Sequence, residues 1–291
     1  MTEPVPALAI VIPHLNDTVR LGRCLAALAA EALPEDVEAV VVDNGSSEDV
    51  AGTVAPYAVR LVHEAERGAA AARNRGVAET RAGAIVFLDA DCLPEPGWLE
   101  AVRAAVPRAD LVGGRVDVFD ETPPPRSGAE AFETVLAFDQ ARYIREVGFS
   151  VTANLVTRRT VFQAIGGFRN GVSEDVEWCQ RATRAGFSLA YAPEMAVRHP
   201  TRADWAALRR KWRRMTEESF ALGGGGRGAR LRWALRAGLV LASPLRDLPR
   251  VLRDPRLRDR GERLRAVATL VRLRALRAVW MLRQAMGATI R

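Results

Sequence analysis

Lysine is almost absent from this chain of 291 residues: of its 42 basic side chains, only Lys211 is a lysine. Any cationic site must therefore use the guanidinium group of arginine, which stays charged and pairs with carboxylates or phosphates in a two-pronged geometry. Cysteine is also scarce, and Cys24, Cys92 and Cys179 are widely spaced with no C-x-x-C pattern. This spacing argues against a disulfide framework and a zinc knuckle, and it favours a reducing compartment.

Long hydrophobic runs are missing as well. The longest apolar stretch of the C-terminal part, residues 237–245, is far shorter than the ~20 residues that a membrane-spanning helix needs. The N-terminus has no charged segment followed by an apolar one, as a signal peptide would. We therefore expect a cytoplasmic protein whose contact with a membrane, if it has one, is peripheral and at the inner face.

Two common phosphate-binding patterns are absent. The chain has no G-x-G-x-x-G after its first apolar run and no G-x-x-x-x-G-K-[ST] at any position. A dinucleotide-binding site and a P-loop therefore lack their usual signatures. The overall composition, with 48% hydrophobic and 26% charged residues, is that of an ordinary globular protein, so disordered and fibrous classes are also excluded.

Charge is present but divided unequally along the chain. Residues 1–200 carry 19 basic and 28 acidic side chains, whereas residues 201–291 carry 23 basic and 7 acidic ones. Two interpretations of the basic tail stay open: a helical extension packed on the main domain with solvated arginines, or a basic helical unit that binds an anionic membrane surface. Nucleic-acid binding is disfavoured, because it would leave the acidic residues of the first part without a function.

The first half of the chain alternates between apolar runs and helical patterns. Strands are predicted over residues 8–13, 37–43, 59–63 and 84–88, and helices over residues 18–32 and 68–80. Strands separated by helices are typical of parallel βαβ units, so the pattern predicts an α/β fold with a mainly parallel, Rossmann-like sheet.

Polar side chains follow these predicted strands. Asp43 ends the second strand, and Asp89 and Asp91 follow the fourth. Because ligands of such sheets bind at the carboxyl ends of the strands, we expect these carboxylates to converge. Turn formation and helix capping explain single acids at such positions, but two acids one residue apart suit a hard divalent cation better, with phosphate oxygens completing its shell.

Several short segments resemble, in order, those of the family 2 glycosyltransferases with the GT-A fold. They are Ile10–Pro13 with Asn16, Val40–Ser47, Gly68–Gly76 with its A-R-N-R-G sequence, Phe87–Asp91, Gly166–Phe168, and Ser173–Trp178 with its E-D pair. The resemblance covers residues 7 to about 200. One departure is Thr152, which stands in V-T-A-N where many relatives read G-x-N.

The resemblance implies a role for each matched residue. The residues implied to contact the nucleotide sugar are Pro13, Asn16, Asp43, Arg73, Asp89 and Asn154. The implied metal ligands are Asp91, Asp89 and His199, and the implied catalytic residue is Asp175 or Glu174. The implied cofactor is Mg²⁺ or Mn²⁺. The implied reaction is an inverting transfer of a sugar from a nucleotide-diphosphate sugar to an acceptor hydroxyl or a lipid phosphate.

The E-D pair has a structural interpretation too. Glu174 and Asp175 can be first-turn acids of a helix, with Ser173 as its N-cap. Both interpretations hold at once if the helix faces the cleft, and Asp175 is the expected general base, with Glu174 as the alternative.

The resemblance also suggests how the chain is organised. We predict a catalytic domain over residues 1–222, with a nucleotide-binding half at 7–115 and an acceptor half at 116–222, and a basic helical extension over 223–291. Two other functions stay open: a catalytically silent scaffold targeted by its tail, and a sugar nucleotidyltransferase. A sugar nucleotidyltransferase normally has a glycine-rich basic loop after the first strand, whereas residues 13–16 of this chain are Pro-His-Leu-Asn.

Overall fold

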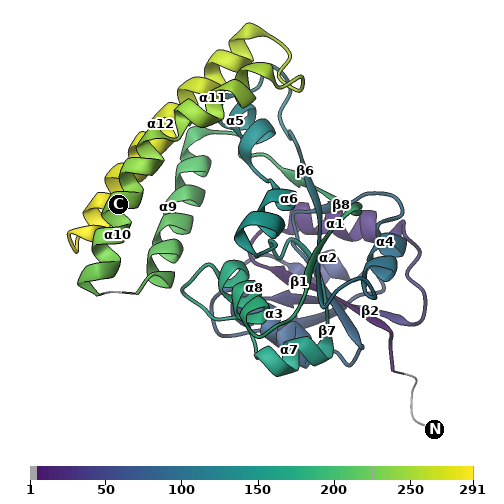
Figure 1. Ribbon diagram of the computed structural model, residues 1–291. Coiled ribbons are helices and arrows are strands. Elements are labelled where there is room, and N and C mark those ends of the chain that lie inside the picture. Colours follow the sequence, from purple (N-terminus) through teal and green to yellow (C-terminus); the bar gives the residue numbers. More distant parts are fainter. Residues whose placement is uncertain (1–4, 225, 291) are drawn as a thin grey trace. The chain divides into compact units, whose positions relative to one another are not determined.

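The computed structural model describes residues 5–224 and 226–290, and these form two compact units (Figure 1). Unit 1 comprises residues up to Asp117 together with Asp139–Asn170 and Glu174–His199; unit 2 comprises Val118–Phe138, Gly171–Ser173 and the chain from Pro200 onward. The predicted boundary at residues 223–226 lies inside unit 2, where Gly225 is outside the described residues. It stays a prediction.

Unit 1 is built on an eight-stranded sheet with the order β3-β2-β1-β4-β7-β6-β8-β5. Its strands are β1 (Leu8–His14), β2 (Val37–Asp43), β3 (Arg60–His63), β4 (Ala84–Leu88), β5 (Leu93–Pro94), β6 (Leu111–Phe119), β7 (Asn154–Arg158) and β8 (Leu189–Pro200). Its helices are α1 (Thr18–Ala29), α2 (Val50–Val54), α3 (Ala69–Ala78), α4 (Trp98–Ala105), α6 (Gln140–Arg142), the π-helix η1 (Tyr143–Val147), α7 (Arg159–Ile165) and α8 (Glu174–Arg184).

The predicted α/β class is confirmed. Strands β1, β2, β3 and β4 pair in parallel, with β1 between β2 and β4. The runs of Val and Ile in β1, β2 and β4 are buried on both faces, as expected for parallel strands covered by helices, whereas Arg60 and His63 of the edge strand β3 are exposed. Strands β4 and β7, β6 and β7, and β5 and β8 pair in antiparallel fashion. The sheet is therefore mixed, and its parallel half holds the four predicted strands.

Helices α3, α7 and α8 gather on one side of the sheet, and α1 and α4 lie on the other (Figure 1). The first side contains an aromatic cluster in which Phe168 contacts Phe87, Phe162 and Trp178. Helix α3 approaches the strands closely at Gly76, where a Cβ atom would lie 2.3 Å from a methyl group of Val11. This close packing fixes the position of α3, which carries a site residue described below.

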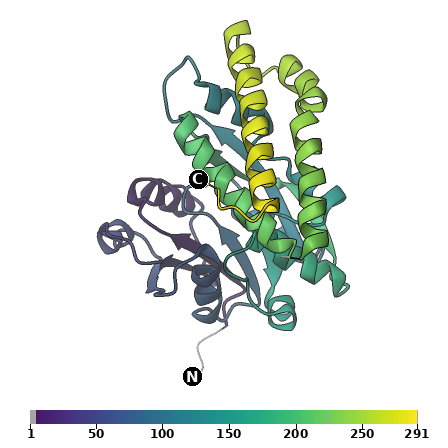
Figure 2. The same ribbon diagram turned by 90° about the vertical axis from the view of Figure 1, so that its left-hand side faces the viewer.

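Unit 2 consists mainly of five helices around its own core. They are α5 (Gly128–Leu136), α9 (Trp205–Leu222), α10 (Arg227–Ala242), α11 (Pro244–Arg253) and α12 (Arg260–Ala285). One cluster joins α5, α9, α11 and α12 through residues such as Phe132, Leu208 and Leu270. A second cluster joins α10 to α12, which lie side by side in Figures 1 and 2, and there Trp233 donates a buried hydrogen bond to Gln284.

The sequence of α12 shows an apolar stripe at helical spacing, but another face of the helix packs inward. Leu264, Val271 and Leu282 belong to that stripe and are exposed to solvent, whereas Leu270 and Leu273 lie outside it and are fully buried. Because α12 is apolar around much of its circumference, periodicity does not select the side that packs. Among the described residues, no helix is both long enough and apolar enough to cross a membrane.

Arginines are part of the interior of unit 2 as well as its surface. The guanidinium groups of Arg274 and Arg277 lie 5.2 and 4.9 Å from the ring centre of Trp212. Arg274 pairs with Asp247, whereas the Nε atom of Arg277 is buried without a hydrogen-bond partner. Burial lowers the pKa of Arg277 to about 9, and the charges of Arg274 and Arg236 act in the same direction.

Replacing Arg277 with methionine is therefore expected to stabilise unit 2. The variant removes a charge that is costly to bury and keeps an unbranched side chain against Trp212, at the loss of one cation–π contact. We expect the free energy of unfolding to rise by about 1–2 kcal/mol, measured by urea denaturation at neutral pH. Arg283→Met, at an exposed position of the same helix, is the control and should change it by about 0.5 kcal/mol or less.

Candidate active site

The predicted convergence of acidic residues is present at the carboxyl ends of β1, β2 and β4. The register of β1 and β2 places His14 beside Asp43 as the last pair of the ladder. Asp43 is buried, and its carboxylate accepts a hydrogen bond from the Ser46 backbone N–H at 2.9 Å and lies 3.2 Å from His63 Nδ1. Although burial opposes the shift, these hydrogen bonds hold the pKa of Asp43 below its usual value, so the carboxylate is ionised.

The loop after β1 is tied to the loop after β2. The Asn16 backbone N–H donates to Ser46 Oγ, and Asn16 Oδ1 accepts from the Ser47 backbone N–H at 2.8 Å. Asn16 has a positive φ of 50°, which asparagine tolerates better than most residues. Pro13 is half-buried just before this loop. Pro13 and Asn16 therefore shape the edge beside Asp43, and their predicted nucleotide contacts stay predictions.

Arg73 joins two motifs that are far apart in the sequence. It lies on α3 with 5% of its side chain exposed, and it donates to Asp89 Oδ1 at 2.6 Å and to Glu174 Oε1 at 2.8 Å. Burial alone would lower the pKa of Arg73, but the two carboxylates raise it instead. The predicted diphosphate-binding arginine thus has both terminal nitrogens bonded to carboxylates, while its Nε is buried without a partner.

Asp175 stands next to this bridge at the start of α8. Burial raises the pKa of Asp175 to about 7, and the negative charge of Glu174 contributes in the same direction. The Arg73 charge and the hydrogen bond from the Val176 N–H oppose the shift. A carboxylate with a pKa near the working pH can both accept and release a proton, which is the property that a general base needs.

Removing Arg73 is expected to affect both stability and proton affinity at this site. In Arg73→Met, Asp89 and Glu174 lose their shared partner, so we expect the free energy of unfolding to fall by about 3 kcal/mol. The pKa of Asp175 should rise further, because the positive charge that opposes its shift is gone. Urea denaturation tests the first effect, and the acid limb of the pH–rate profile tests the second.

Arg75 offers a matched control for this variant. It lies on the same helix, but its side chain is 43% exposed and pairs with Glu79 at the surface. Arg75→Met should change the free energy of unfolding by less than about 1 kcal/mol and leave the acid limb in place. Equal effects of the two substitutions would contradict the special role of the Arg73 bridge.

Asp91 and His199 meet at the other end of the D-x-D motif. The short strand β5 pairs antiparallel with β8, with Leu93 opposite Arg198. The residues just before β5 therefore run beside the end of β8, where His199 Nε2 lies 3.3 Å from Asp91 Oδ2. His199 is buried and Asp91 is partly exposed. Two of the predicted metal ligands are therefore neighbours in space although they are more than a hundred positions apart in the chain.

The Asp91–His199 pair fits a divalent cation. Adjacent ligands of an octahedral ion with bonds of about 2.1 Å lie about 3 Å apart, close to the separation observed here. Within residues 5–224 and 226–290, no three His, Cys, Asp or Glu side chains form a metal-binding group, so further ligands must come from substrate or water. Asp89, the other predicted ligand, is bonded to Arg73 instead.

Asn154 does not contribute to an accessible site. Its side chain is fully buried, and its amide nitrogen donates to the carbonyl oxygens of Arg115 and Met195. Its amide oxygen accepts a hydrogen bond from Trp98 Nε1. With its hydrogen bonds made inside the protein, Asn154 joins β6, β8 and α4, and we assign it to the sheet rather than to sugar binding. Trp98 is itself fully buried.

The G-G-F segment and the A-R-N helix hold each other in place. Asn74 accepts from the Phe168 backbone N–H and donates to the Phe168 carbonyl oxygen. A Cβ atom on Gly167 would approach Asn74 Oδ1 to 2.6 Å, which explains the glycine there. Glu177 and Arg181, four positions apart, form an ion pair on α8. These contacts fix α8, and with it Asp175, relative to α3.

Two further histidines lie at strand ends. His63 closes the strand predicted over residues 59–63, ends β3 and contacts Asp43, and His14 ends β1 with both ring nitrogens buried and without a hydrogen-bond partner. Burial lowers the pKa of His14, so its ring is neutral near pH 7, despite the opposing charge of Asp43. A signal was available in the sequence, because both residues directly follow apolar strand patterns.

Comparison with known proteins gives one family. The family model described as "Glycosyltransferase like family 2" matches residues 6–216. Glycosyltransferase AglE of Haloferax volcanii is 30% identical over 224 residues, covering 73% of each chain. The pre-mycofactocin glycosyltransferase of Mycobacterium tuberculosis is 32% identical over 214 residues, which are 68% of this chain but only 44% of that protein.

Solved structures agree at the level of the fold. Mannosyltransferase PcManGT from Pyrobaculum calidifontis, in complex with GDP-Man and Mn²⁺, is similar with a TM-score of 0.56 and 17% identity, covering 99% of this chain and 77% of that one. S. aureus TarS in complex with UDP-GlcNAc has a TM-score of 0.54 and 15% identity, covering 98% and 93%. At these identities the likeness concerns the fold alone.

Proposed function

The chain belongs to the family 2 glycosyltransferases and transfers a sugar from a nucleotide sugar, and from this premise we propose an inverting, metal-dependent transfer with Asp175 as general base. The observation that carries the proposal is the half-buried Asp175 with its pKa raised to about 7, set beside the Arg73 bridge. Asp175 as a single proton acceptor, with no covalent intermediate between sugar and protein, fits direct displacement with one inversion at the anomeric carbon.

The proton and the electron pairs move as follows in this proposal. Asp175 takes the proton of the acceptor hydroxyl as its oxygen forms a bond to the anomeric carbon of the sugar. The bond from that carbon to the diphosphate oxygen breaks, and the nucleoside diphosphate leaves with the electron pair. Glu174 is already bonded to Arg73, which leaves Asp175 as the acid of the pair that accepts the proton.

A divalent metal fits the same site. Asp91 and His199 would hold it, with the donor's diphosphate oxygens as further ligands. When bound there, such an ion would supply positive charge to stabilise the leaving diphosphate. The Mn²⁺ that accompanies GDP-Man in the PcManGT structure supports this choice. Mg²⁺ is the other candidate, since both ions prefer hard oxygen ligands.

The donor and acceptor are proposed at the level of chemical class. Asp43 and the loop of Pro13 and Asn16 are positioned for polar contacts with the base and ribose of the donor. The acceptor is a hydroxyl group or a lipid phosphate. Within the described residues the three cysteines are buried and form no disulfide, which supports the reducing cytoplasm as the compartment.

The test is turnover of a panel of UDP-, GDP- and dTDP-sugars with Mn²⁺, read as release of nucleoside diphosphate, with alcohols and polyprenyl phosphates as acceptors. Proton NMR of the product gives the anomeric configuration, and inversion is expected. Retention would overturn the single-displacement mechanism. Failure to bind any nucleotide sugar would favour the scaffold function instead.

A further inference from the structure

A row of exposed leucines runs along α10. Leu231, Leu235 and Leu239 are spaced four residues apart, and they are 64%, 67% and 73% exposed. Residues four apart lie on the same face of a helix. The other side of α10 is occupied, because Trp233 and Ala237 are buried in the cluster with α12. Packing inside unit 2 therefore explains why one face of α10 is apolar, but it does not explain the three exposed leucines on the other face.

Two more leucines are exposed nearby in the sequence. Leu241 and Leu245 are 57% and 79% exposed, at the end of α10 and the start of α11. Leu241 follows the buried Ala237 by four positions, so it does not continue the row of Leu231, Leu235 and Leu239. Single exposed leucines are common on protein surfaces, whereas a row of them on one helix face marks an interaction site. We call Leu231, Leu235 and Leu239 the leucine face.

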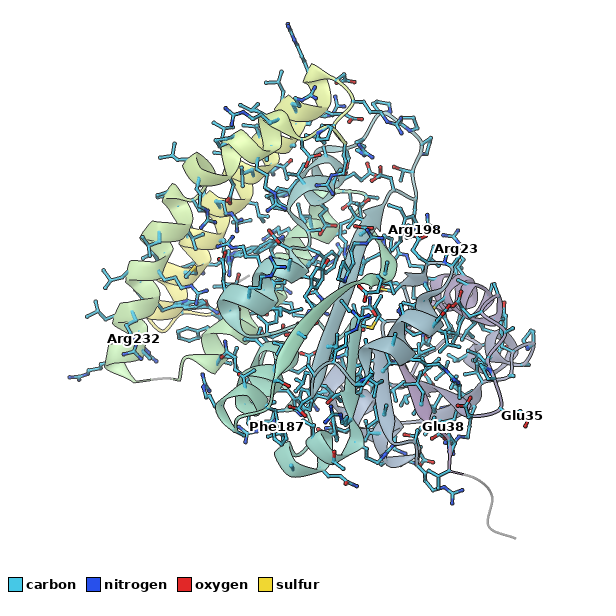
Figure 3. All side chains as sticks on the ribbon, turned by 45° about the vertical axis from the view of Figure 1, so that its right-hand side comes forward. Arg23, Glu35, Glu38, Phe187, Arg198 and Arg232 are labelled. Atoms are coloured by element: carbon cyan, nitrogen blue, oxygen red, sulfur yellow. The ribbon has the colours of Figure 1, made fainter. Side chains whose placement is uncertain are left out.

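The charge along α10 has one sign. Residues 223–242 contain four arginines and no aspartate or glutamate, whereas Arg246 on α11 pairs with the neighbouring Asp247. Arg227, Arg230 and Arg232 are exposed on the first turns of α10, and Figure 3 shows Arg232 at that end of the helix. Arg236 is exposed one position after Leu235. Exposed leucines interspersed with arginines match a partner that has an apolar interior beneath a negatively charged surface layer.

We propose that the leucine face of α10 binds the surface of an anionic phospholipid bilayer. A helix of this kind lies in the interface, with its leucines among the acyl chains and its guanidinium groups at the level of the phosphates. A second copy of the chain is a poorer occupant, because it would bring two sets of arginines together without an acid to pair them. Nucleic acid would leave the leucines in water.

This inference concerns a surface of unit 2 and does not rest on the proposed catalytic residues. It adds a partner to the proposed function: a bilayer on this face supplies any acceptor that is itself a lipid phosphate. The two can fail separately, because turnover with a water-soluble acceptor measures the active site and vesicle binding measures the leucine face.

The experiment is co-sedimentation of the full chain with phosphatidylcholine vesicles that do or do not contain phosphatidylglycerol. We expect binding to the anionic vesicles and little binding to pure phosphatidylcholine. The variant with Leu231→Ser, Leu235→Ser and Leu239→Ser should lose at least about 100-fold in partitioning, since each leucine contributes roughly tenfold when buried. Arg227→Gln with Arg232→Gln should lose about 20- to 30-fold, because each arginine near the surface contributes about fivefold.

Val19→Ser in unit 1 is the matched control, because Val19 is 67% exposed, as much as Leu235. It should bind vesicles as the unmodified chain does, and all variants should keep the same melting temperature and the same release of nucleoside diphosphate with a water-soluble acceptor. Equal sedimentation of the leucine variant and the unmodified chain would overturn the proposal. So would sedimentation-velocity data showing a vesicle-free dimer that the leucine substitutions dissociate.

Discussion

Replacing Asp175 with asparagine is expected to lower kcat by about 10³-fold, within the range that a positioned general base contributes. Asparagine keeps the size of the side chain, and its Oδ1 can still accept the hydrogen bond from the Val176 N–H, but it cannot take the proton of the acceptor. The measurement is the initial rate of sugar transfer with saturating donor and Mn²⁺. Binding of the nucleoside diphosphate should be unchanged, because the base acts on the acceptor.

The pH dependence gives a second readout of the same residue. Burial and Glu174 raise the pKa of Asp175 to about 7. A base acts in its ionised form, so the rate of the unmodified enzyme should fall as the pH drops through about 7 and level off above it. The residual rate of Asp175→Asn should lack this acid limb. An unchanged rate, or an unchanged limb in the variant, would refute Asp175 as the base.

Glu174→Gln separates the two acids of the E-D pair. Since Glu174 is bonded to Arg73 and its charge raises the pKa of Asp175, the variant should shift the acid limb to lower pH. Its kcat should fall by roughly tenfold, far less than that of Asp175→Asn, because no proton passes through Glu174. The reverse order of the two losses would assign the base to Glu174.

Much of the parallel half of the sheet was predictable because its signals are local. The predicted strand at residues 37–43 coincides with β2, and the one at residues 84–88 with β4. Buried parallel strands are short apolar runs with a turn-forming residue at each end. Neighbouring residues in the sequence therefore indicate where such a strand begins and ends. The first predicted helix ends earlier than expected, at Ala29.

Antiparallel pairing and unit 2 depend on contacts that periodicity does not encode. Strand β7 lies beside β4 although about seventy residues separate them. Helix α5 packs with α9 and α12 in one core, which joins the chain on both sides of the predicted boundary. On α12 the apolar side chains surround the helix, and only the neighbours decide that Leu270 points inward and Val271 outward.

The site was predicted as a set of residues but not as a set of pairs. The strand-end rule indicated Asp43, Asp89 and Asp91 correctly as neighbours of one edge. That Arg73 would bond to Asp89 and Glu174 depends on how α3 and α8 pack on the sheet. Asn154 shows the opposite case: its motif match suggested a sugar contact, while full burial and three protein hydrogen bonds give it a structural role.

The second large effect is expected for Asp91. In Asp91→Asn the carboxylate beside His199 is lost, so a divalent cation would lose one of the two ligands of this pair. We expect Mn²⁺ affinity in the presence of a nucleoside diphosphate to fall by about 100-fold, and transfer to fall by about 10²- to 10³-fold as several kcal/mol of charge stabilisation are lost. Electron paramagnetic resonance of free Mn²⁺ measures the first, and initial rates measure the second.

Asp117→Asn is the matched control, because Asp117 is a half-exposed carboxylate of the same unit that pairs only with Arg115 among the described ion pairs. It should leave Mn²⁺ affinity and rate unchanged. His199→Gln should resemble Asp91→Asn in Mn²⁺ affinity, and the double variant should lose little more than either single one, since both side chains act through one ion. Full additivity of the two losses, or tight Mn²⁺ binding by Asp91→Asn, would show that the two residues do not share a cation.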